Sequence, residues 1–123
     1  MIPVKGYSVY VKKDLGDFGV VLLNRKNVVI PKEHGWCLMA AFMDFEGDDP
    51  KPNPKRVTDV MKLIEIQFGK KVETKPVWCG MRAVTPDELP LIGRLQKYDN
   101  LYVATGASMR GFCLSFGIAQ MLS

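Results

Sequence analysis

Residues 53–69 read Asn-Pro-Lys-Arg-Val-Thr-Asp-Val-Met-Lys-Leu-Ile-Glu-Ile-Gln-Phe-Gly, and this stretch decides the fold. Asn53 can cap a helix, Pro54 suits the first helical position, and Gly69 can end the helix. Between these ends the apolar residues fall at helical spacing, at Val57, Val60, Met61, Ile64 and Phe68. The pattern predicts an amphipathic helix over residues 54–68 that lies across one face of a sheet.

Short runs of β-branched and aromatic residues precede this helix, separated by Gly and Asn at turn positions. The runs are residues 4–11, 18–23, 28–30 and 36–45. They predict four strands that form an antiparallel meander. Together with the helix they indicate the α+β class: an antiparallel sheet covered by an amphipathic helix.

The segment after the helix predicts a return to the sheet and then a second structural part. Residues 72–84 have the composition of a strand, and Pro86 and Pro90 make residues 85–90 a rigid loop. Residues 101–104 predict a short buried strand, and the pattern from Met109 onward predicts a helix to residue 123. These elements form a terminal strand, turn and helix.

The last helix is apolar on nearly every side. Its apolar residues are Phe112, Cys113, Leu114, Phe116, Ile118, Ala119, Met121 and Leu122. A helix of this kind is normally buried on all sides. We therefore expect a second subunit or a partner chain to cover it.

Composition and charge restrict the class of protein. The 123 residues are 47% apolar and 24% charged, as in an ordinary globular protein, and the formal net charge is +4. The basic residues are dispersed along the chain and no RNA-reading motif is present, so nucleic-acid binding is disfavoured. No window approaches a transmembrane span and no secretory signal begins the sequence, which favours a cytoplasmic protein.

The three cysteines do not form a metal or disulfide pattern. Cys37, Cys79 and Cys113 are widely spaced and include no CxxC pair. Each lies in an apolar stretch, so we expect small buried side chains and a reducing compartment. The sequence also has no Ser, His and Asp arrangement of a hydrolase and no clustered carboxylates.

Residues 106–111 are a candidate for binding an anion. Gly106 and Gly111 have the spacing of a phosphate-binding loop, but Phe112 and Cys113 replace its Lys and Ser or Thr, and no GxGxxG motif follows a strand in residues 1–123. What remains is a strand, a glycine turn and a helix N-terminus, with Arg110 in the first turn. This arrangement favours an anion or an electron-rich carbonyl, or is an ordinary strand-to-helix turn.

Arg82 is the second candidate. It follows Trp78 in a locally apolar stretch and precedes the proline-rich loop. A guanidinium can hold a carboxylate in a bidentate fork, and a structural ion pair with Asp87 is the alternative.

Three segments resemble one family in the same order and at similar spacing. They are PVKGYS at residues 3–8, WCGMRAVTPD with PLIG at residues 78–87 and 90–93, and NLYVATG at residues 100–106 with Gly111. They resemble the FAD-dependent D-amino-acid dehydrogenase and glycine oxidase family. The family pattern has proline, glycine and histidine where this chain has Ala83, Glu88 and Ala107.

The resemblance implies roles for particular residues. It implies that Arg82 binds the carboxylate of the amino-acid substrate. It also implies that the turn and the start of the following helix contact the flavin, through Gly106, Ala107, Ser108, Met109, Arg110 and Gly111. It implies FAD as cofactor and hydride transfer from the substrate α-carbon. The chemistry then rests on binding geometry, with no protein nucleophile.

The resemblance also implies an organisation. Residues 1–84 correspond to a substrate-type sheet domain and residues 85–123 to the C-terminal, flavin-contacting segment of an incomplete FAD-binding domain. We expect the substrate-side part of an amino-acid oxidoreductase, inactive alone and working with an FAD-binding chain or as a homo-oligomer. A non-catalytic remnant or subunit, permitted by Ala83 and Ala107, is the alternative.

Overall fold

Residues 1–13, 22–23, 27–69 and 71–123 are described by the structure, a computed structural model. They divide into a larger unit, residues 5–80, and a smaller unit, residues 1–4 and 81–123. Strands β1 (Ile2–Lys12) and β5 (Trp78–Val84) contribute residues to both units. The chain therefore leaves the smaller unit along β1 and returns to it along β5.

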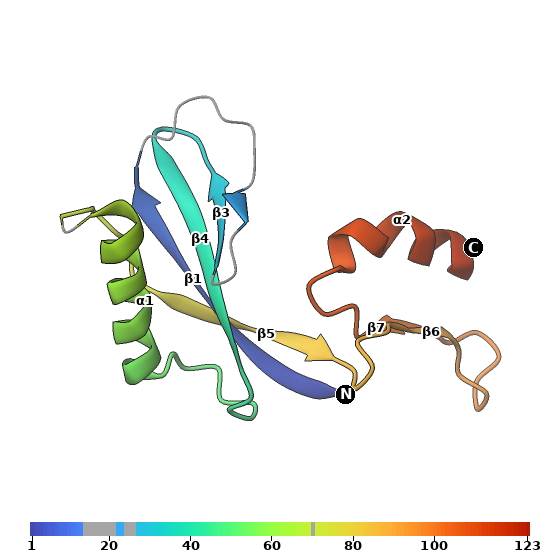
Figure 1. The fold of residues 1–123 in the computed structure, drawn as a ribbon. Helices are drawn as coiled ribbons and strands as arrows, with labels where there is room; N and C mark the ends of the chain where they lie inside the picture. Colours follow the sequence, from blue (N-terminus) through green and yellow to red (C-terminus); the bar gives the residue numbers. More distant parts are fainter. Residues whose placement is uncertain (14–21, 24–26, 70) are drawn as a thin grey trace. The chain divides into compact units, whose positions relative to one another are not determined.

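The main sheet has five strands in the order β2-β3-β4-β1-β5 (Figure 1). Strands β2 (Leu22–Leu23), β3 (Asn27–Pro31) and β4 (Trp36–Asp44) pair with their sequence neighbours in antiparallel fashion. Strand β1, however, pairs with β4 and not with β2. The predicted four-strand meander is therefore wrong in the placement of its first strand.

The reason for this placement is the burial of β1. Its residues 4–9 are all buried, and β1 is an interior strand that lies between β4 and β5. The register with β4 shifts between Lys5 and Tyr7, as at a β-bulge. The predicted strand at 18–23 falls mostly on residues 14–21, outside the described residues, and β2 is its described end.

Helix α1 (Pro54–Phe68) has the predicted bounds. The Asn53 side chain accepts a hydrogen bond from the Lys55 amide at 3.0 Å, and the Gly69 amide donates to the Glu65 carbonyl at 3.1 Å. The helix lies beside the sheet in Figure 1 and buries Val60 and Ile64. These two side chains pack with a cluster of sheet residues: Tyr7, Val9, Val11, Val29, Cys37 and Met39. The prediction of a sheet covered by an amphipathic helix is confirmed.

The segment between α1 and β5 is less regular than predicted. Only residues 78–84 of the expected strand 72–84 form β5. Thr74 forms an isolated antiparallel bridge with Val11, and the Lys75 amide donates to the Tyr10 carbonyl at 2.9 Å. Pro76 lacks an amide donor, which prevents a continuous ladder.

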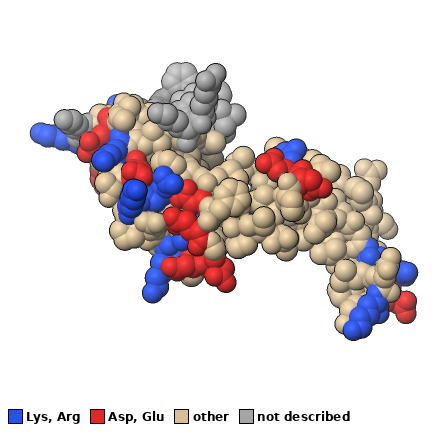
Figure 2. Space-filling view, turned by 60° about the horizontal axis from the view of Figure 1, so that its bottom comes forward, with Lys and Arg blue, Asp and Glu red and all other residues tan. Residues whose placement is uncertain are grey.

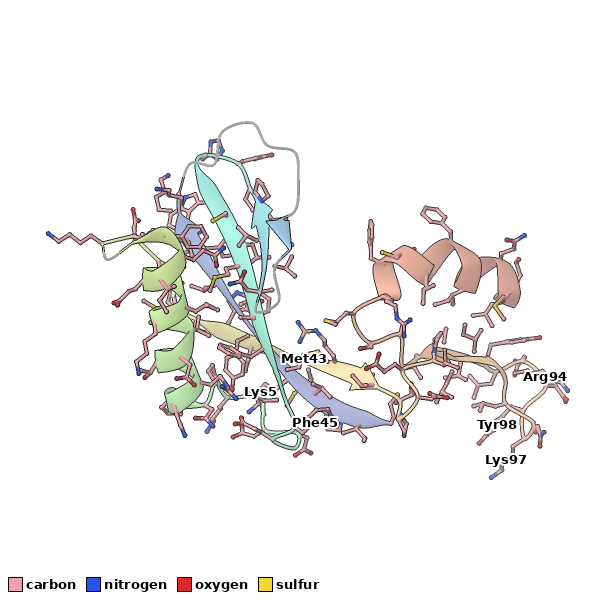
Figure 3. All side chains as sticks on the ribbon, in the orientation of Figure 1. Lys5, Met43, Phe45, Arg94, Lys97 and Tyr98 are labelled. Atoms are coloured by element: carbon pink, nitrogen blue, oxygen red, sulfur yellow. The ribbon has the colours of Figure 1, made fainter. Side chains whose placement is uncertain are left out.

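The smaller unit contains a hairpin that the sequence pattern did not predict. Strand β6 (Leu91–Arg94) pairs in antiparallel fashion with β7 (Tyr102–Thr105) in a separate two-stranded sheet. Arg94 ends β6, and Lys97 and Tyr98 lie in the turn that joins the two strands (Figure 3). Strand β7 is not buried as predicted: Tyr102 is half exposed, and β6 is the one strand that pairs with β7 among the described residues.

Helix α2 (Gly111–Leu122) begins two residues later than predicted. Ser108 has φ of +51°, which lies outside the right-handed helix, and the Arg110 amide donates to the Ala107 carbonyl in a turn. None of the described residues of α2 is buried, and Phe112 and Phe116 are 91% and 87% exposed. The apolar surface predicted for this helix is therefore present, and the side that carries Phe112 and Phe116 is uncovered in the described structure.

Two features of the surface bear on the sequence predictions. Cys37 is buried, but Cys79 is half-buried and Cys113 is exposed, so the prediction of three buried thiols was wrong. Cys113 lies on the exposed side of α2, whereas Leu114, Ile118 and Leu122 of the same helix are half-buried. On the face in Figure 2, acidic and basic side chains lie next to one another. Within the described part of the chain, no helix is long and apolar enough to cross a membrane.

Candidate functional site

Arg82 is a half-buried side chain on β5, in the smaller unit. Its Nη1 atom is buried and has no hydrogen-bond partner among the described residues. The alternative ion pair with Asp87 does not form in the described structure. A buried guanidinium nitrogen without a partner is costly, so this atom is suited to an anion with a planar, bidentate shape.

The Asp87 carboxylate accepts a hydrogen bond from its own turn. Its Oδ1 accepts a hydrogen bond from the Leu89 amide at 3.1 Å, and this bond is the main reason that the pKa of Asp87 lies below its ordinary value. The Glu88 amide donates to the Thr85 carbonyl at 3.0 Å, and the Thr85 hydroxyl donates to the Leu89 carbonyl at 2.7 Å. Residues 85–89, called the 85–89 turn, are therefore held by their own hydrogen bonds.

The second candidate segment, residues 106–111, lies directly against this turn. Ala107 forms an antiparallel bridge with Val84, and the Ser108 amide donates to the Ala83 carbonyl at 3.3 Å. Gly106 has φ of +77°, and a Cβ atom there would lie 2.8 Å from the Thr85 Cγ2 atom. The residue must be glycine for both reasons. The structure thus brings the end of Arg82's strand together with the turn that precedes α2.

The start of α2 carries free backbone donors. Arg110 occupies the N-cap position, and no side chain caps the helix. The Leu114 amide is bonded to the Arg110 carbonyl at 2.9 Å, so the amides before it have no partner within the helix. Met109 is 66% exposed. An uncapped helix start whose amides are free suits an electron-rich acceptor.

The Arg110 side chain turns toward the 85–89 turn. Its Nη2 atom donates to the Glu88 carbonyl at 2.6 Å, and the same atom lies 3.9 Å from the Glu88 carboxylate. The sequence pattern did not assign Glu88 or Thr85 a part in this site. The departure from glycine at position 88 was the available signal, because Glu88 has φ of +58°.

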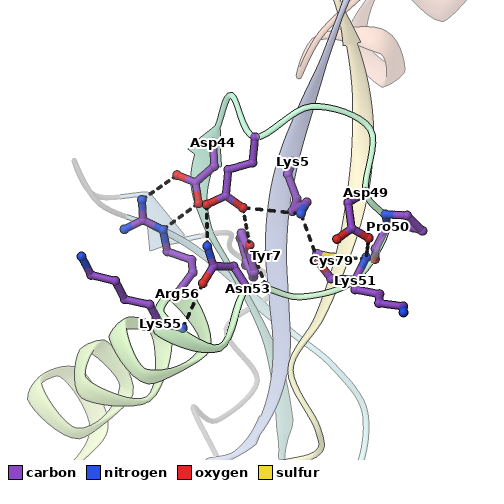
Figure 4. A network of polar contacts seen from close by, with 11 residues as sticks. Lys5, Tyr7, Asp44, Asp49, Pro50, Lys51, Asn53, Lys55, Arg56 and Cys79 are labelled. Carbon is purple, nitrogen blue, oxygen red and sulfur yellow. Dashed lines mark hydrogen bonds and ion pairs between the residues drawn. The ribbon is translucent and has the colours of Figure 1, made fainter.

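The larger unit has a separate polar network around Lys5 and Tyr7, in the first half of β1 (Figure 4). Lys5 is buried and donates to the Lys51 carbonyl at 3.0 Å and to Glu46 at 3.4 Å. Asn53 donates to Glu46 at 2.8 Å, and Arg56 holds Asp44 with two bonds of 2.6 and 2.7 Å. These bonds fasten the loop before α1, and we assign the network no part in the site. The described residues include no cluster of three or more His, Cys, Asp or Glu side chains that could hold a metal.

Comparison with known proteins decides the family. A family model described as FAD dependent oxidoreductase matches residues 1–123. The chain belongs to this family. The resemblance found in the sequence motifs is therefore confirmed, and FAD is the cofactor that the family implies.

Among the relatives of the family, a D-amino acid dehydrogenase from Neisseria meningitidis serogroup C (strain 053442) is 30% identical over 124 residues. The match covers 97% of this chain and 29% of that protein. A D-amino acid dehydrogenase from Agrobacterium fabrum is 29% identical and is covered over 30% of its length. The chain thus spans about three tenths of the length of these relatives.

Solved structures of the family share the fold. Glycine oxidase from Bacillus cereus ATCC 14579 matches with a TM-score of 0.80 at 24% identity, over 98% of this chain and 34% of that one. Glycine oxidase from Geobacillus kaustophilus has a TM-score of 0.81 at 23% identity, with the same shares covered. L-proline dehydrogenase from P. horikoshii has a TM-score of 0.74 at 22% identity. The α+β fold is therefore that of FAD-dependent oxidoreductases.

Proposed function

We propose that this chain is the substrate-side and flavin-contacting part of an FAD-dependent oxidoreductase that oxidises the CH–NH2 group of an amino acid. The observation that carries the proposal is the buried Nη1 atom of Arg82, which has no partner among the described residues. An amino-acid carboxylate supplies two coplanar oxygens, which complete the hydrogen bonds of a guanidinium. Arg82 would bind and orient the substrate through this group.

The start of α2 fits the cofactor by the chemistry of its donors. Free amides at a helix N-terminus, with the positive end of the helix dipole, stabilise negative charge on the pyrimidine edge of a reduced flavin. We assign this contact to residues 106–111, of which Gly106 is buried and Gly111 begins the helix. When bound, FAD supplies the hydride acceptor of the reaction.

The rest of the FAD requires residues outside this sequence. Residues 1–123 include no GxGxxG motif after a strand. We therefore assign the FAD pyrophosphate to a dinucleotide-binding segment, in a partner chain or in further residues of the same protein. The proposal includes no activity of residues 1–123 alone.

The carboxylate assignment is tested by titrating the ¹⁵N-labelled protein with D-alanine and following the Arg82 side-chain resonance. We expect the resonance to move with D-alanine and not with alaninamide, which has no carboxylate. Arg82→Lys loses the fork and should weaken binding roughly tenfold. Arg94→Lys, an exposed arginine on β6, is the matched control and should bind as the wild type does.

The same titration distinguishes the alternative of a non-catalytic subunit. The substitutions at Ala83 and Ala107 permit that alternative. A protein whose Arg82 resonance ignores D-alanine would support that alternative and would contradict the proposed carboxylate site.

A further inference from the structure

Glu88 has an unusual backbone conformation, and its carbonyl group is hydrogen-bonded to Arg110. Its φ of +58° lies in the left-handed region, where a side chain costs free energy that glycine does not. The Glu88 carbonyl accepts a 2.6 Å hydrogen bond from the Arg110 guanidinium. A hydrogen bond from a charged donor is short and strong, so this contact can offset part of the cost of the conformation.

The same contact joins two segments that are distant in the sequence. Glu88 belongs to the 85–89 turn, next along the chain from Arg82's strand, and Arg110 is the N-cap of α2. Backbone contacts tie residues 83–84 to residues 107–108. Among the described residues, Arg110 supplies the side-chain hydrogen bond between the 85–89 turn and the start of α2.

The charge of Arg110 also requires this partner. A cation in the first turn of a helix opposes the helix dipole. Here the Glu88 carboxylate lies 3.9 Å from the guanidinium, although both side chains are more than half exposed, so screening by water weakens the pair. The main partner of the guanidinium is therefore Glu88, and its carbonyl oxygen accepts the stronger interaction.

We propose that Arg110 is a positioning residue, whose hydrogen bond to the Glu88 carbonyl fixes the start of α2 against the 85–89 turn. We call this contact the Glu88–Arg110 clasp. It orders the free amides of α2 relative to the strand that carries Arg82. The inference that the clasp positions these amides for the flavin rests on the proposed function, whereas the contact between Glu88 and Arg110 does not.

Amide hydrogen exchange of the 123-residue protein tests the clasp. The reporters are the bonded amides of Glu88, Ser108 and Leu114, and the internal control is the Gly69 amide of the larger unit. Arg110→Met removes the donor and should make the three reporters exchange about fivefold faster, as the loss of one hydrogen bond predicts. Arg110→Lys keeps a donor and should lie closer to the wild type.

Glu88→Gly is the matched variant on the other side of the contact. It retains the carbonyl acceptor and removes the strained side chain, so the reporters should exchange at the wild-type rate or more slowly. Unchanged reporters in Arg110→Met would overturn the proposal, as would an equal acceleration of the Gly69 amide. Glu88→Gly exchanging as fast as Arg110→Met would show that the carboxylate is the partner, which also contradicts the clasp.

Adding FAD separates the clasp from the proposed function. If α2 contacts the flavin, the amide resonances of Gly111 and Phe112 should shift in the wild type and shift less in Arg110→Met. Wild-type resonances that ignore FAD would contradict the flavin contact and leave the exchange result standing. Resonances that shift equally in both proteins would show that the clasp does not position these amides for the flavin.

Discussion

Glycine 106 shows how a single residue holds the candidate site together. It combines φ of +77° with a space in which a Cβ atom would lie 2.8 Å from the Thr85 methyl group. Thr85 is buried and its hydroxyl is bonded within the 85–89 turn, so the methyl group cannot move away at low cost. Close packing of the two segments of the site therefore depends on the absence of a side chain.

We predict that Gly106→Ala lowers the free energy of unfolding by roughly 1–3 kcal/mol, the sum of backbone strain and overlap. Gly117 is the matched control, because it lies inside α2 and a methyl group added there would meet no described atom within 4 Å. Gly117→Ala should raise stability by up to about 1 kcal/mol through helix propensity. Urea unfolding followed by circular dichroism measures both. Equal effects of the two substitutions would contradict this account of Gly106.

At the scale of elements, the loop before α1 depends on one carboxylate. Glu46 accepts hydrogen bonds from Asn53, Lys5 and Tyr7, and the bond from Asn53 is the main reason that its pKa lies below the ordinary value of 4.5. The unfolded chain therefore binds this proton at a higher pH than the folded protein does. Glu46 contributes stability above its unfolded pKa, and that stability is lost as pH falls through the folded pKa.

We predict that the wild type loses stability as pH falls below about 4.5, the ordinary pKa of a glutamate, and that Glu46→Gln loses less over the same range. Asp87, whose pKa is also lowered, should retain part of the acid dependence in that variant. Glu65→Gln, at an exposed position of α1, is the control. Unfolding midpoints measured across this window decide the matter, and identical acid profiles for Glu46→Gln and the wild type would refute the prediction.

The sequence predicted elements well where the signals were local. Helix α1 has its predicted bounds because the cap, the spacing of apolar residues and the final glycine all lie within residues 53–69. The pairing of β1 with β4 joins residues about thirty positions apart, which no local pattern encodes. Strand β6 has four residues, and its pairing with β7 gives it a structure that its own composition does not specify.

The candidate site was predictable to a similar extent. The motif around Arg82 singled out the arginine as a candidate, and the glycine turn singled out residues 106–111. The unpaired Nη1 atom of Arg82 was not predictable, because the sequence does not show that Asp87 bonds to the Leu89 amide and forms no ion pair with Arg82 among the described residues. The Glu88 carbonyl accepts its hydrogen bond from Arg110 while residue 88 is in the left-handed conformation, and a glutamate in the sequence does not predict that conformation.

At the scale of the whole molecule, the exposed apolar side of α2 bears on whether the protein associates in solution. Phe112 and Phe116 lie one helical turn apart and are almost fully exposed. Apolar surface of this extent drives association in water. We predict that the protein self-associates, or binds a partner that covers this face.

Sedimentation velocity of the wild type and of the Phe112→Glu, Phe116→Glu double variant measures this association. The double variant should be monomeric where the wild type forms larger species. Ile66→Glu, at an 81% exposed apolar residue of α1, is the control and should associate as the wild type does. A wild type that stays monomeric at every concentration and binds no dinucleotide-binding segment would argue against the prediction.

The central claim, that this chain supplies the carboxylate site of an FAD-dependent amino-acid oxidoreductase, is tested most directly by a chimera. Residues 1–123 replace the matching segment of the Neisseria D-amino acid dehydrogenase, and the visible absorption of the flavin is followed after anaerobic addition of D-alanine. We predict a yellow protein whose flavin bleaches with D-alanine, and an Arg82→Met version that stays yellow but bleaches far more slowly. A yellow chimera that bleaches equally well with and without Arg82 would contradict the claim.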